Sequence, residues 1–327
     1  MEYYAGIDVG GTKICAIIIN AEGRILSRAK LKTGDDLKFE RVFERILECY
    51  HAACREANIS EEEIAAVGLA IPSSVDFERR IIKHAPNLGW RNIAIGNMFK
   101  EKFGKPGFID NDVNLGTFGE YHFGAGKGYH SVYGMFVGTG IGGGYIFNGE
   151  IIRGVSYTAS EVGHSIIKMN GPRCGCGNKG CLEAIAAKSG MSNYIKKLVD
   201  HNKQKTALDK IAPNWRTTIV SSSALRKAFD QGDKVVIKAL NRSAKAIGVA
   251  AANLITLAGV EAIILGGGVI EELGDFFMPR IKKAMLKNTF ANGAEGVKLL
   301  QSKLGDDATA LGAAWFVRLP EKRNLLF

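Results

Sequence analysis

The sequence predicts an α/β protein made of two similar domains, and three observations support this fold class. The 327 residues are 46% hydrophobic and 23% charged, which is enough apolar material for packed cores. Strand patterns are followed by helical patterns along the chain. A three-strand unit that begins at Tyr3 returns from Ser131 with the same order of strands and glycine turns. Repetition of a whole supersecondary unit indicates an internal duplication, so we expect two α/β domains that face each other across a cleft.

The first half contains three predicted strands, a helix and two further strands. Turns rich in Gly and Asn separate the first strands, which are predicted over Tyr3–Val9, Ile14–Ile19 and Ile25–Leu31. Apolar residues then recur at helical spacing: Phe39, Val42, Phe43, Ile46, Leu47, Tyr50 and Cys54. Strands follow at Val67–Ile71 and Gly107–Ile109, and a helix is predicted over Leu115–Phe123.

The second half repeats this order and adds helices. Its strands are predicted over Val132–Val137, Tyr145–Phe147 and Glu150–Arg153, and later over Ala262–Leu265 and Val297–Leu300. Its helices are predicted over Ala184–Val199, Val235–Leu257 and Asp307 to about Val317. The more polar stretch Asn202–Ser223, which contains Pro213, is predicted to be a loop excursion.

Charge and cysteine usage limit the classes of partner and compartment. The chain has 43 Lys and Arg residues against 33 Asp and Glu residues, a formal net charge of +10. The basic residues are scattered, which favours anionic small-molecule substrates over nucleic acid or a membrane surface. No apolar run reaches membrane-spanning length and no signal-peptide pattern is present, so we expect a cytoplasmic protein. Cys15, Cys49 and Cys54 lie in apolar or helical patterns and are expected to be buried core thiols.

Three glycine-rich segments follow predicted strands. The residues concerned are Asp8, Gly10, Gly11, Thr12 and Lys13 in the first, Gly138, Thr139 and Gly140 in the second, and Gly266, Gly267 and Gly268 in the third. The second segment continues to Gly144 and holds five glycines in seven residues. Backbone N–H groups without a neighbouring Cβ can approach an anion closely, so the segments are predicted to bind the phosphates of one nucleotide. Two alternatives stay open: the first segment can be an ordinary hairpin turn, and the third a tight connection from strand to helix.

Asp110, Asn111 and Asp112 lie where a predicted strand ends and a helix begins. In phosphoryl transfer the protein mainly positions groups, and a carboxylate hydrogen-bonded to the attacking hydroxyl orients it and takes its proton. The alternative is helix capping, because Asn and Asp are favoured at helix N-termini, and Asp110 or Asn111 can serve that role alone.

Three cysteines separated by glycines form the strongest local pattern. Cys174, Cys176 and Cys181 follow His164 closely, and this set matches a Cys₃His site for a tetrahedral ion. A disulfide is not expected in a reducing cytosol, and iron–sulfur clusters usually take four cysteines. We therefore predict a structural Zn²⁺. The ion can fix the tautomer of His164 and direct its other ring N–H outward.

The chain resembles the ROK family of sugar kinases and sugar-responsive repressors over essentially its whole length. The segments that carry the resemblance are DVGGTK at 8–13, VGTGIGGG at 137–144 and LGGGV at 265–269, the last of which contacts adenosine in that family. The resemblance implies the duplicated actin-like/hexokinase (ribonuclease H-like) ATPase fold with an interdomain cleft, and ATP and Mg²⁺ as cofactors. It further implies a smaller α/β domain over 1–112, completed by the C-terminal helix 306–327, and a larger domain over 113–305 that carries the zinc motif.

The same resemblance assigns roles to individual residues. It implies that Asp112 is the catalytic base and that Asn111 contacts sugar hydroxyls. Asp8 lies at the end of a strand beside the first glycine segment, a position that suits a phosphate with its metal, so we expect it to help hold the ion through water. Sugar-binding roles are also implied for Asn87, Glu161, His164 and Glu183; for Asn87 the alternative is a turn residue, and for the two glutamates an exposed surface position. Ser73 stands where the family usually has Gly, which affects the expected substrate more than the expected reaction.

The predicted function is therefore ATP-dependent phosphorylation of a hexose, similar to that of a glucokinase. N-acetylmannosamine, N-acetylglucosamine, fructose or allose remain alternative acceptors, and polyphosphate remains an alternative donor. A sugar-sensing repressor is disfavoured because only four residues precede Ala5, which leaves no room for a helix-turn-helix. The cysteine cluster with His164 also disfavours an actin-like ATPase or chaperone, because nucleotide hydrolysis alone does not require such a cluster. By analogy with the family we expect a homodimer or homotetramer.

Overall fold

The computed structural model describes residues 2–76 and 79–326, and it consists of two compact units. The first unit comprises the chain up to residue 128, residues 144–159 and the segment from 306 onward, and the second comprises residues 129–143 and 160–305. The first unit thus extends beyond the expected boundary at residue 112. The reason is that helix α3 (Asp112–Phe123) packs against α10 (Ala308–Arg318).

The first unit is built on a five-stranded sheet with the order β3-β2-β1-β4-β8. The strands are β1 (Tyr3–Val9), β2 (Lys13–Asn20), β3 (Ile25–Lys32), β4 (Ile64–Ile71) and β8 (Gly107–Asn111). The first three form the predicted antiparallel meander, whereas β4 runs parallel to both β1 and β8. The strands predicted from the sequence are confirmed, with ends that differ by a few residues.

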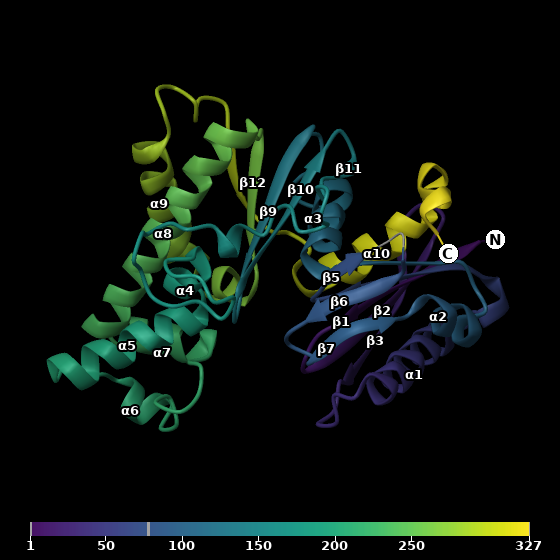
Figure 1. Ribbon diagram of the computed structural model, residues 1–327, viewed down its shortest axis with the longest axis horizontal. Helices are drawn as coiled ribbons and strands as arrows, with labels where there is room; N and C mark the ends of the chain where they lie inside the picture. The colour runs from purple at the N-terminus through teal and green to yellow at the C-terminus, as the bar shows by residue number, and fades with distance from the viewer. Residues whose placement is uncertain (1, 77–78, 327) are drawn as a thin grey trace. The chain divides into compact units, whose positions relative to one another are not determined.

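Helices cover both faces of this sheet (Figure 1). Helix α1 (Phe39–Ala57) buries its apolar side against Ala5, Ile7 and Val9 of β1, which point to one face because side chains alternate along a strand. Gly6 points to the other face, where a Cβ would lie 1.9 Å from the carbonyl oxygen of Ala310 in α10. The absence of a side chain at residue 6 therefore lets α10 lie directly on the strand.

A three-stranded sheet and one helix of the first unit were not predicted from the sequence. The sheet consists of β5 (Ser74–Asp76), β6 (Ile81–Ala85) and β7 (Trp90–Ala94), and the helix is α2 (Gly96–Phe103). These strands are short and carry charged residues among the apolar ones, so they show little alternation.

A second five-stranded sheet has the order β11-β10-β9-β12-β13. Its strands are β9 (Ser131–Val137), β10 (Ile141–Phe147), β11 (Glu150–Ile151), β12 (Ala262–Gly266) and β13 (Lys298–Gln301). As in the first sheet, a three-strand meander is extended by two parallel strands, because β12 runs parallel to both β9 and β13. The repeated order confirms the α/β fold class and the internal duplication.

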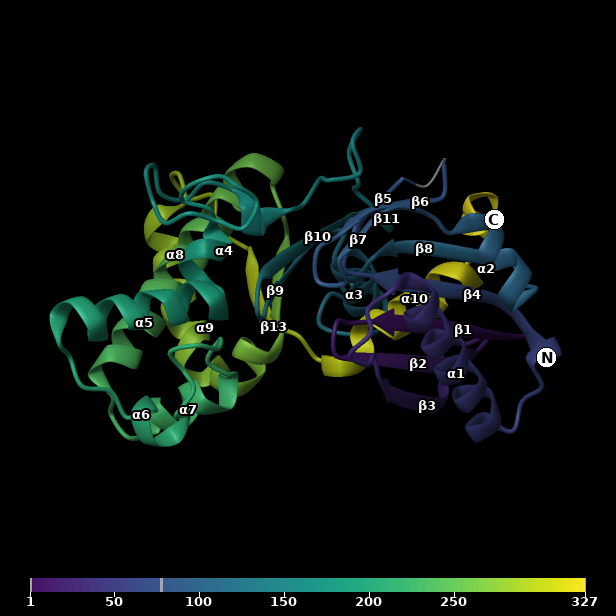
Figure 2. The same cartoon turned by 60° about the horizontal axis from the view of Figure 1, so that its bottom comes forward.

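The helices of the second unit follow β11 in the chain (Figure 2). They are α4 (Leu182–Ala186), α5 (Lys188–Asn202), α6 (Leu208–Ile211), α7 (Ser222–Asp230), α8 (Lys234–Ala258) and α9 (Gly268–Asn288). The single helix predicted over 184–199 is wrong, because the chain leaves helical geometry at Ala187. The predicted loop excursion contains α6 and the fully buried Trp215, whose indole N–H donates to Asp209 at 3.0 Å. No helix among residues 2–76 and 79–326 has the length and apolar character needed to span a membrane.

Candidate functional site

Two carboxylates of the first unit lie at the carboxyl ends of its parallel strands. Asp8 is next to last in β1, and Ala70 of β4 lies opposite both Asp8 and Asp110. Asp112 follows β8 as the first residue of α3. The pKa of Asp8 is raised to about 7 by its burial and, next in size, by the negative charge of Asp112. The sheet therefore brings the predicted metal-binding acid and the predicted base into electrostatic contact.

Asn111 explains why α3 begins at Asp112. Its side-chain oxygen accepts hydrogen bonds from the N–H groups of Val113 at 2.8 Å and Asn114 at 3.1 Å, which makes it the N-cap. Its Nδ2 donates to the carbonyl oxygen of Ser73 at 3.2 Å. Asn111 therefore serves the capping role that the sequence left open. Its side-chain amide has two N–H groups, and the bond to Ser73 uses one of them.

Asp110 has a structural role that differs from that of its neighbours. It is 2% exposed and accepts from Nε and Nη2 of Arg153 at 2.9 and 2.7 Å. The Arg153 guanidinium also stacks on the rings of Phe108 and Phe316. This buried two-bond pair holds the junction between β8 and α3 in place, and Arg153 was not identified from the sequence.

The first glycine hairpin lies against Asn87. The N–H of Gly10 donates to the carbonyl oxygen of Lys13 at 2.8 Å, which closes the turn. A Cβ on Gly11 would lie 3.2 Å from the carbonyl oxygen of Asn87. Neither glycine has a left-handed φ, so close approach rather than backbone conformation favours glycine at residue 11. Asn87, predicted to bind sugar, is exposed beside this hairpin.

Asp306 is a further acidic residue at this end of the first unit. Its carboxylate pairs with Nζ of Lys13 at 2.8 Å and of Lys30 at 3.2 Å, and its charge contributes to the raised pKa of Asp8. Sequence reasoning did not select it. The only signal is the segment Gly305–Asp307 before the predicted last helix, which resembles a helix start more than a binding motif.

The second glycine hairpin, between β9 and β10, is held by the helices that follow the cysteine segment. The carbonyl oxygens of Gly138 and Thr139 accept from the N–H groups of Lys188 at 3.0 Å and Ser189 at 3.3 Å. A Cβ on Gly140 would lie 2.3 Å from Oε2 of Glu183, whereas a Cβ on Gly138 would meet nothing within 4 Å. Packing therefore explains the glycine at 140 but not the one at 138.

The third glycine segment lies beside the second. Gly267 precedes α9 with a φ of +83°, and a Cβ there would lie 2.7 Å from the carbonyl oxygen of Val137, the last residue of β9. The tight strand-to-helix connection thus requires glycine at 267. At Gly268, in contrast, a Cβ would have only the Ser222 hydroxyl nearby, at 3.7 Å.

The four predicted zinc ligands come together in the second unit. The ligand atoms of His164, Cys174, Cys176 and Cys181 all lie within 4.8 Å of one another. A tetrahedral zinc with Zn–S of about 2.3 Å and Zn–N of about 2.0 Å requires S···S of about 3.8 Å and S···N of about 3.5 Å. The Cys176–Cys181 sulfur distance is 3.7 Å, and Sγ of Cys174 lies 3.6 Å from Nδ1 of His164. The donor set therefore fits zinc, with Nδ1 as the histidine ligand.

Glu183 links this cysteine cluster to the glycine hairpin. Its Oε2 accepts from the N–H of Ile141 at 3.1 Å, and its Oε1 lies 3.7 Å from Sγ of Cys174. Burial, and then the charge of Glu183, raise the pKa of Glu161, which the charge of His164 opposes. Glu161, His164 and Glu183 thus form one group, and both glutamates are partly buried, not exposed surface residues.

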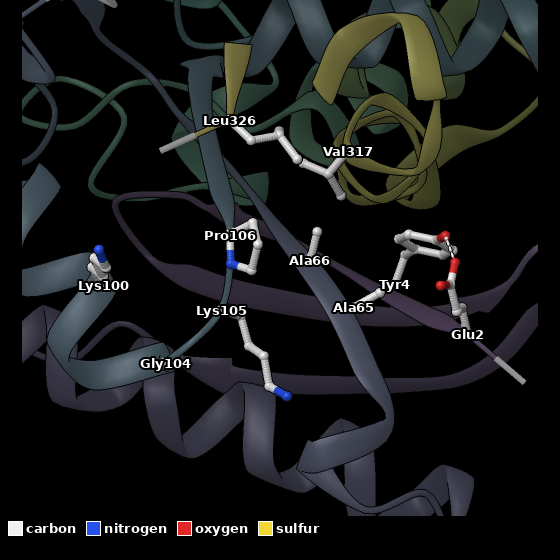
Figure 3. A pocket seen from close by; sticks show the side chains of 10 residues that line it. All are labelled: Glu2, Tyr4, Ala65, Ala66, Lys100, Gly104, Lys105, Pro106, Val317 and Leu326. Carbon is white, nitrogen blue, oxygen red and sulfur yellow. Dashed lines mark hydrogen bonds between the residues drawn. The ribbon is translucent and has the colours of Figure 1, made fainter. Parts of the chain in front are cut away.

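A cavity of about 680 Å³ in the first unit contains none of these residues (Figure 3). It is lined by Tyr4 near the start of β1, by Ala65 and Ala66 near the start of β4, and by Lys105 and Pro106 just before β8. It therefore lies at the amino ends of the parallel strands, whereas Asp8 and Asp112 lie at their carboxyl ends. Ligands of open α/β sheets bind at the carboxyl ends, so this cavity is not the candidate site.

Comparison with known proteins gives a consistent result. A model of the ROK family matches residues 4–319. Glucokinase from Halalkalibacterium halodurans is 29% identical over 322 residues, which cover 98% of this chain and 96% of that protein. The xylose repressor of Caldicellulosiruptor bescii is 30% identical and covers 94% of this chain, which spans 76% of the repressor.

The solved structures include a ROK family glucokinase from Streptomyces griseus in complex with glucose and AMPPNP. It is 31% identical, with a TM-score of 0.82, and the match covers 95% of this chain and 98% of that one. The resemblance found in the glycine and cysteine motifs is thereby confirmed, and the chain belongs to the ROK family.

Proposed function

We propose that this protein transfers the γ-phosphoryl group of ATP to a hydroxyl of a hexose, with Asp112 as the catalytic base. The observation that carries the proposal is the position of Asp112 at the capped start of α3, in electrostatic contact with Asp8. The relatives of this protein include glucokinases that match over nearly the whole chain. The glucose and AMPPNP bound by the Streptomyces griseus relative support a hexose and an adenine nucleotide as ligands.

Each residue then has a defined task. The Asp112 carboxylate accepts the proton of the sugar hydroxyl, whose oxygen forms a bond to the γ-phosphorus while the bond from that phosphorus to the leaving ADP oxygen breaks. The N–H groups of the hairpins that follow β1 and β9 bind phosphate oxygens, and Lys13 adds a positive charge. Mg²⁺ supplies charge neutralisation on the phosphates. Asp8 is suited to a water-mediated contact with this cation, because burial and the charge of Asp112 disfavour its ionised form unless a cation is nearby.

The zinc cluster has an architectural role in this proposal. With Nδ1 directed at the ion, the other ring nitrogen of His164 carries the proton and donates to a sugar hydroxyl. Glu161 accepts from another hydroxyl of the same sugar, and Glu183 holds the second hairpin beside the cluster while taking part in sugar binding. Asn87 is assigned a sugar-binding role as well.

The test is ADP release against a panel of glucose, mannose, fructose, allose, N-acetylglucosamine and N-acetylmannosamine. Asp112→Ala is expected to lower kcat at least about a hundredfold while the sugar dissociation constant changes by less than about tenfold. Asp35→Asn, which removes an exposed carboxylate from the same unit, is the matched control and should keep full activity. Turnover by Asp112→Ala at the wild-type rate would place the base elsewhere.

The second candidate function is sugar sensing without turnover, which the similarity to xylose repressors favours. The same experiment separates the two functions. A wild-type protein that binds a sugar from the panel but releases no ADP with any of them would be a sensor. Replacing ATP by polyphosphate in the assay identifies the phosphoryl donor.

A further inference from the structure

A second pocket in the second unit has an unusual charge. It has a volume of about 500 Å³ and is lined by Lys168, Lys238, Arg242 and Lys245, together with Tyr194 and apolar residues that include Ile185. No carboxylate is among the residues that line it. It contains none of the residues assigned above to catalysis, nucleotide, sugar or zinc.

The helical period of α8 produces this concentration of charge. Lys238, Arg242 and Lys245 are spaced i, i+4 and i+7, so they lie on one face of the helix. Like charges at this spacing repel one another, and an intervening acidic residue would normally relieve the repulsion. The other side of α8 is buried against α4, α5 and α9, so the basic face cannot turn away from the pocket (Figure 1).

The remaining walls come from two other segments. Tyr194 lies on α5, and Lys168 lies in the irregular segment that follows His164. The N–H groups of Ile167 and Lys168 both donate to the carbonyl oxygen of Gly180, at 2.9 and 3.2 Å. Lys168 is thus held in position by the cysteine loop rather than by a mobile surface segment.

Arg242 differs from the other arginines that stack on aromatic rings. Its guanidinium lies 4.3 Å from the centroid of the Tyr194 ring. Five other arginines of the described chain that stack on a ring also donate to an oxygen: Arg153 to Asp110, Arg216 to Asp209, Arg226 to Asp275, Arg280 to Asn241 and Arg318 to Ala21. The guanidinium of Arg242 makes no hydrogen bond or ion pair to any residue that the structure describes. Burial lowers the pKa of Arg242, which is the direction expected for a cation that has no anionic partner.

From the unpaired, stacked Arg242 and the three lysines around it, we propose that this pocket binds the phosphate group of a small phosphorylated molecule. A guanidinium that stacks on a ring presents its N–H edge to a planar or tetrahedral oxyanion, and lysines supply further charge around it. Ile167, Ile185 and Val249 give the pocket an apolar side for the body of the ligand. This inference does not depend on the proposed kinase function.

The position of the pocket also suggests a consequence of binding. Ser243, next to Arg242 on α8, donates to the carbonyl oxygen of Ala186 at 2.7 Å. Ala186 ends α4, which also carries Glu183 and follows the last zinc ligand, Cys181. A phosphorylated ligand in this pocket would therefore contact α4 through Ile185, and the same short helix supports the second glycine hairpin through Glu183.

Inorganic pyrophosphate and a hexose phosphate are the probes, and two readouts are needed because the glycine hairpins are themselves proposed to bind phosphate. The first is calorimetric titration of wild type and of Lys238→Gln/Lys245→Gln, two exposed positions. We expect the double variant to weaken one class of binding sites at least about tenfold. The matched control is Lys282→Gln/Lys283→Gln, which removes two exposed charges from α9 and should bind as wild type does.

The second readout is modification of arginine by phenylglyoxal, followed by peptide mass spectrometry. Pyrophosphate should slow modification of Arg242 at least about fivefold, at an ionic strength matched with chloride. Arg216, which also stacks on a ring but is paired with Asp209, is the internal control and should react at an unchanged rate. Equal protection of both arginines, or an isotherm unaltered in the α8 double variant, would overturn the proposal. Tighter binding of the hexose phosphate than of pyrophosphate would identify a sugar phosphate as the ligand.

Discussion

The Asp8 carboxyl combines burial with two neighbouring acids, and this makes its negative charge unfavourable unless a cation is bound. Its folded pKa of about 7 lies above its ordinary value of 3.8. Between these values the folded protein holds a proton that the unfolded chain has lost. Stability from this group is therefore fully present below about pH 4 and is lost as the pH rises to about 7. Over the whole range the loss is on the order of 4 kcal/mol at most.

Asp8→Asn should therefore be more stable than wild type at pH 8, by about 1–3 kcal/mol, and similar to it near pH 4.5. Urea unfolding at pH 4.5, 6 and 8, without magnesium or nucleotide, measures the difference. Asp35→Asn, at an exposed position, should show no such trend. A stability difference for Asp8→Asn that stays constant across the three pH values would contradict the assigned pKa.

The two glycines that flank Thr139 differ in what surrounds them. At Gly140 a side chain would collide with the Glu183 carboxylate, whereas at Gly138 the space is open and φ is not left-handed. A purely structural hairpin would tolerate alanine at 138. A hairpin whose backbone approaches a phosphate would not, because the added Cβ stands in the space that the ligand needs.

Gly138→Ala should accordingly leave the melting temperature within about 1 °C of wild type but weaken ATP binding about tenfold. Gly140→Ala should lower the free energy of unfolding by about 1–3 kcal/mol, because Glu183 must move. Thermal melts and nucleotide titrations of the two variants measure both effects. Unchanged ATP affinity in Gly138→Ala would assign the second glycine segment to turn formation alone.

At the scale of elements, prediction from sequence succeeded where local pattern decides the structure. In the meander, β1 and β2 are apolar, β-prone runs bounded by turn residues and β3 alternates, whereas the long helix α8 has helical spacing; all four elements were found. The break at Ala187 was missed because it depends on a tertiary contact: the N–H groups of Lys188 and Ser189 leave the helix pattern to bond the second hairpin. Trp215 fell within the predicted loop because the sequence around it is polar, and its hydrogen-bond partner Asp209 is an exposed carboxylate of the same stretch.

The segment from His164 to Glu183 has little regular structure, so bound metal is expected to stabilise it. Cys181→Ser should reduce zinc from about one ion per chain to almost none and lower the melting temperature. Cys54→Ser is the matched control, because it places a hydroxyl in another buried thiol position without touching the cluster.

His164→Ala should lower both zinc content and sugar affinity. Elemental analysis and calorimetry measure these quantities, and full zinc occupancy in His164→Ala would remove this residue from the ligand set.

At the scale of the whole molecule, the duplicated fold explains which site residues could be found from sequence. Asp8, Asp112 and the glycine segments lie at corresponding strand ends, and each belongs to a local motif. The contacts that hold these motifs in place join segments that are far apart in the chain: Asp110 with Arg153, Lys13 with Asp306, and Ile141 with Glu183. No local pattern reports such pairs, so Arg153 and Asp306 became visible only in the folded structure.

The first unit is assembled from three chain segments, and α10, in the last of them, packs on the first segment through close backbone contacts. A Cβ on Gly312 would lie 1.8 Å from the carbonyl oxygen of Leu115 in α3. Gly312→Ala should therefore destabilise the first unit by roughly 3 kcal/mol or more, because two helices must separate. The second unit does not contain this contact and should keep its stability.

The three tryptophans allow this prediction to be measured, because Trp90 and Trp315 lie in the first unit and Trp215 in the second. Trp215→Phe leaves fluorescence from the first unit alone, and Trp90→Phe/Trp315→Phe leaves fluorescence from the second. In urea, Gly312→Ala should lower the midpoint denaturant concentration of the first unit, reported by Trp90 and Trp315. The midpoint of the second unit, reported by Trp215, should not change. Equal shifts in both would mean that the two units unfold as one cooperative body, and the duplication would then describe ancestry and topology but not independent stability.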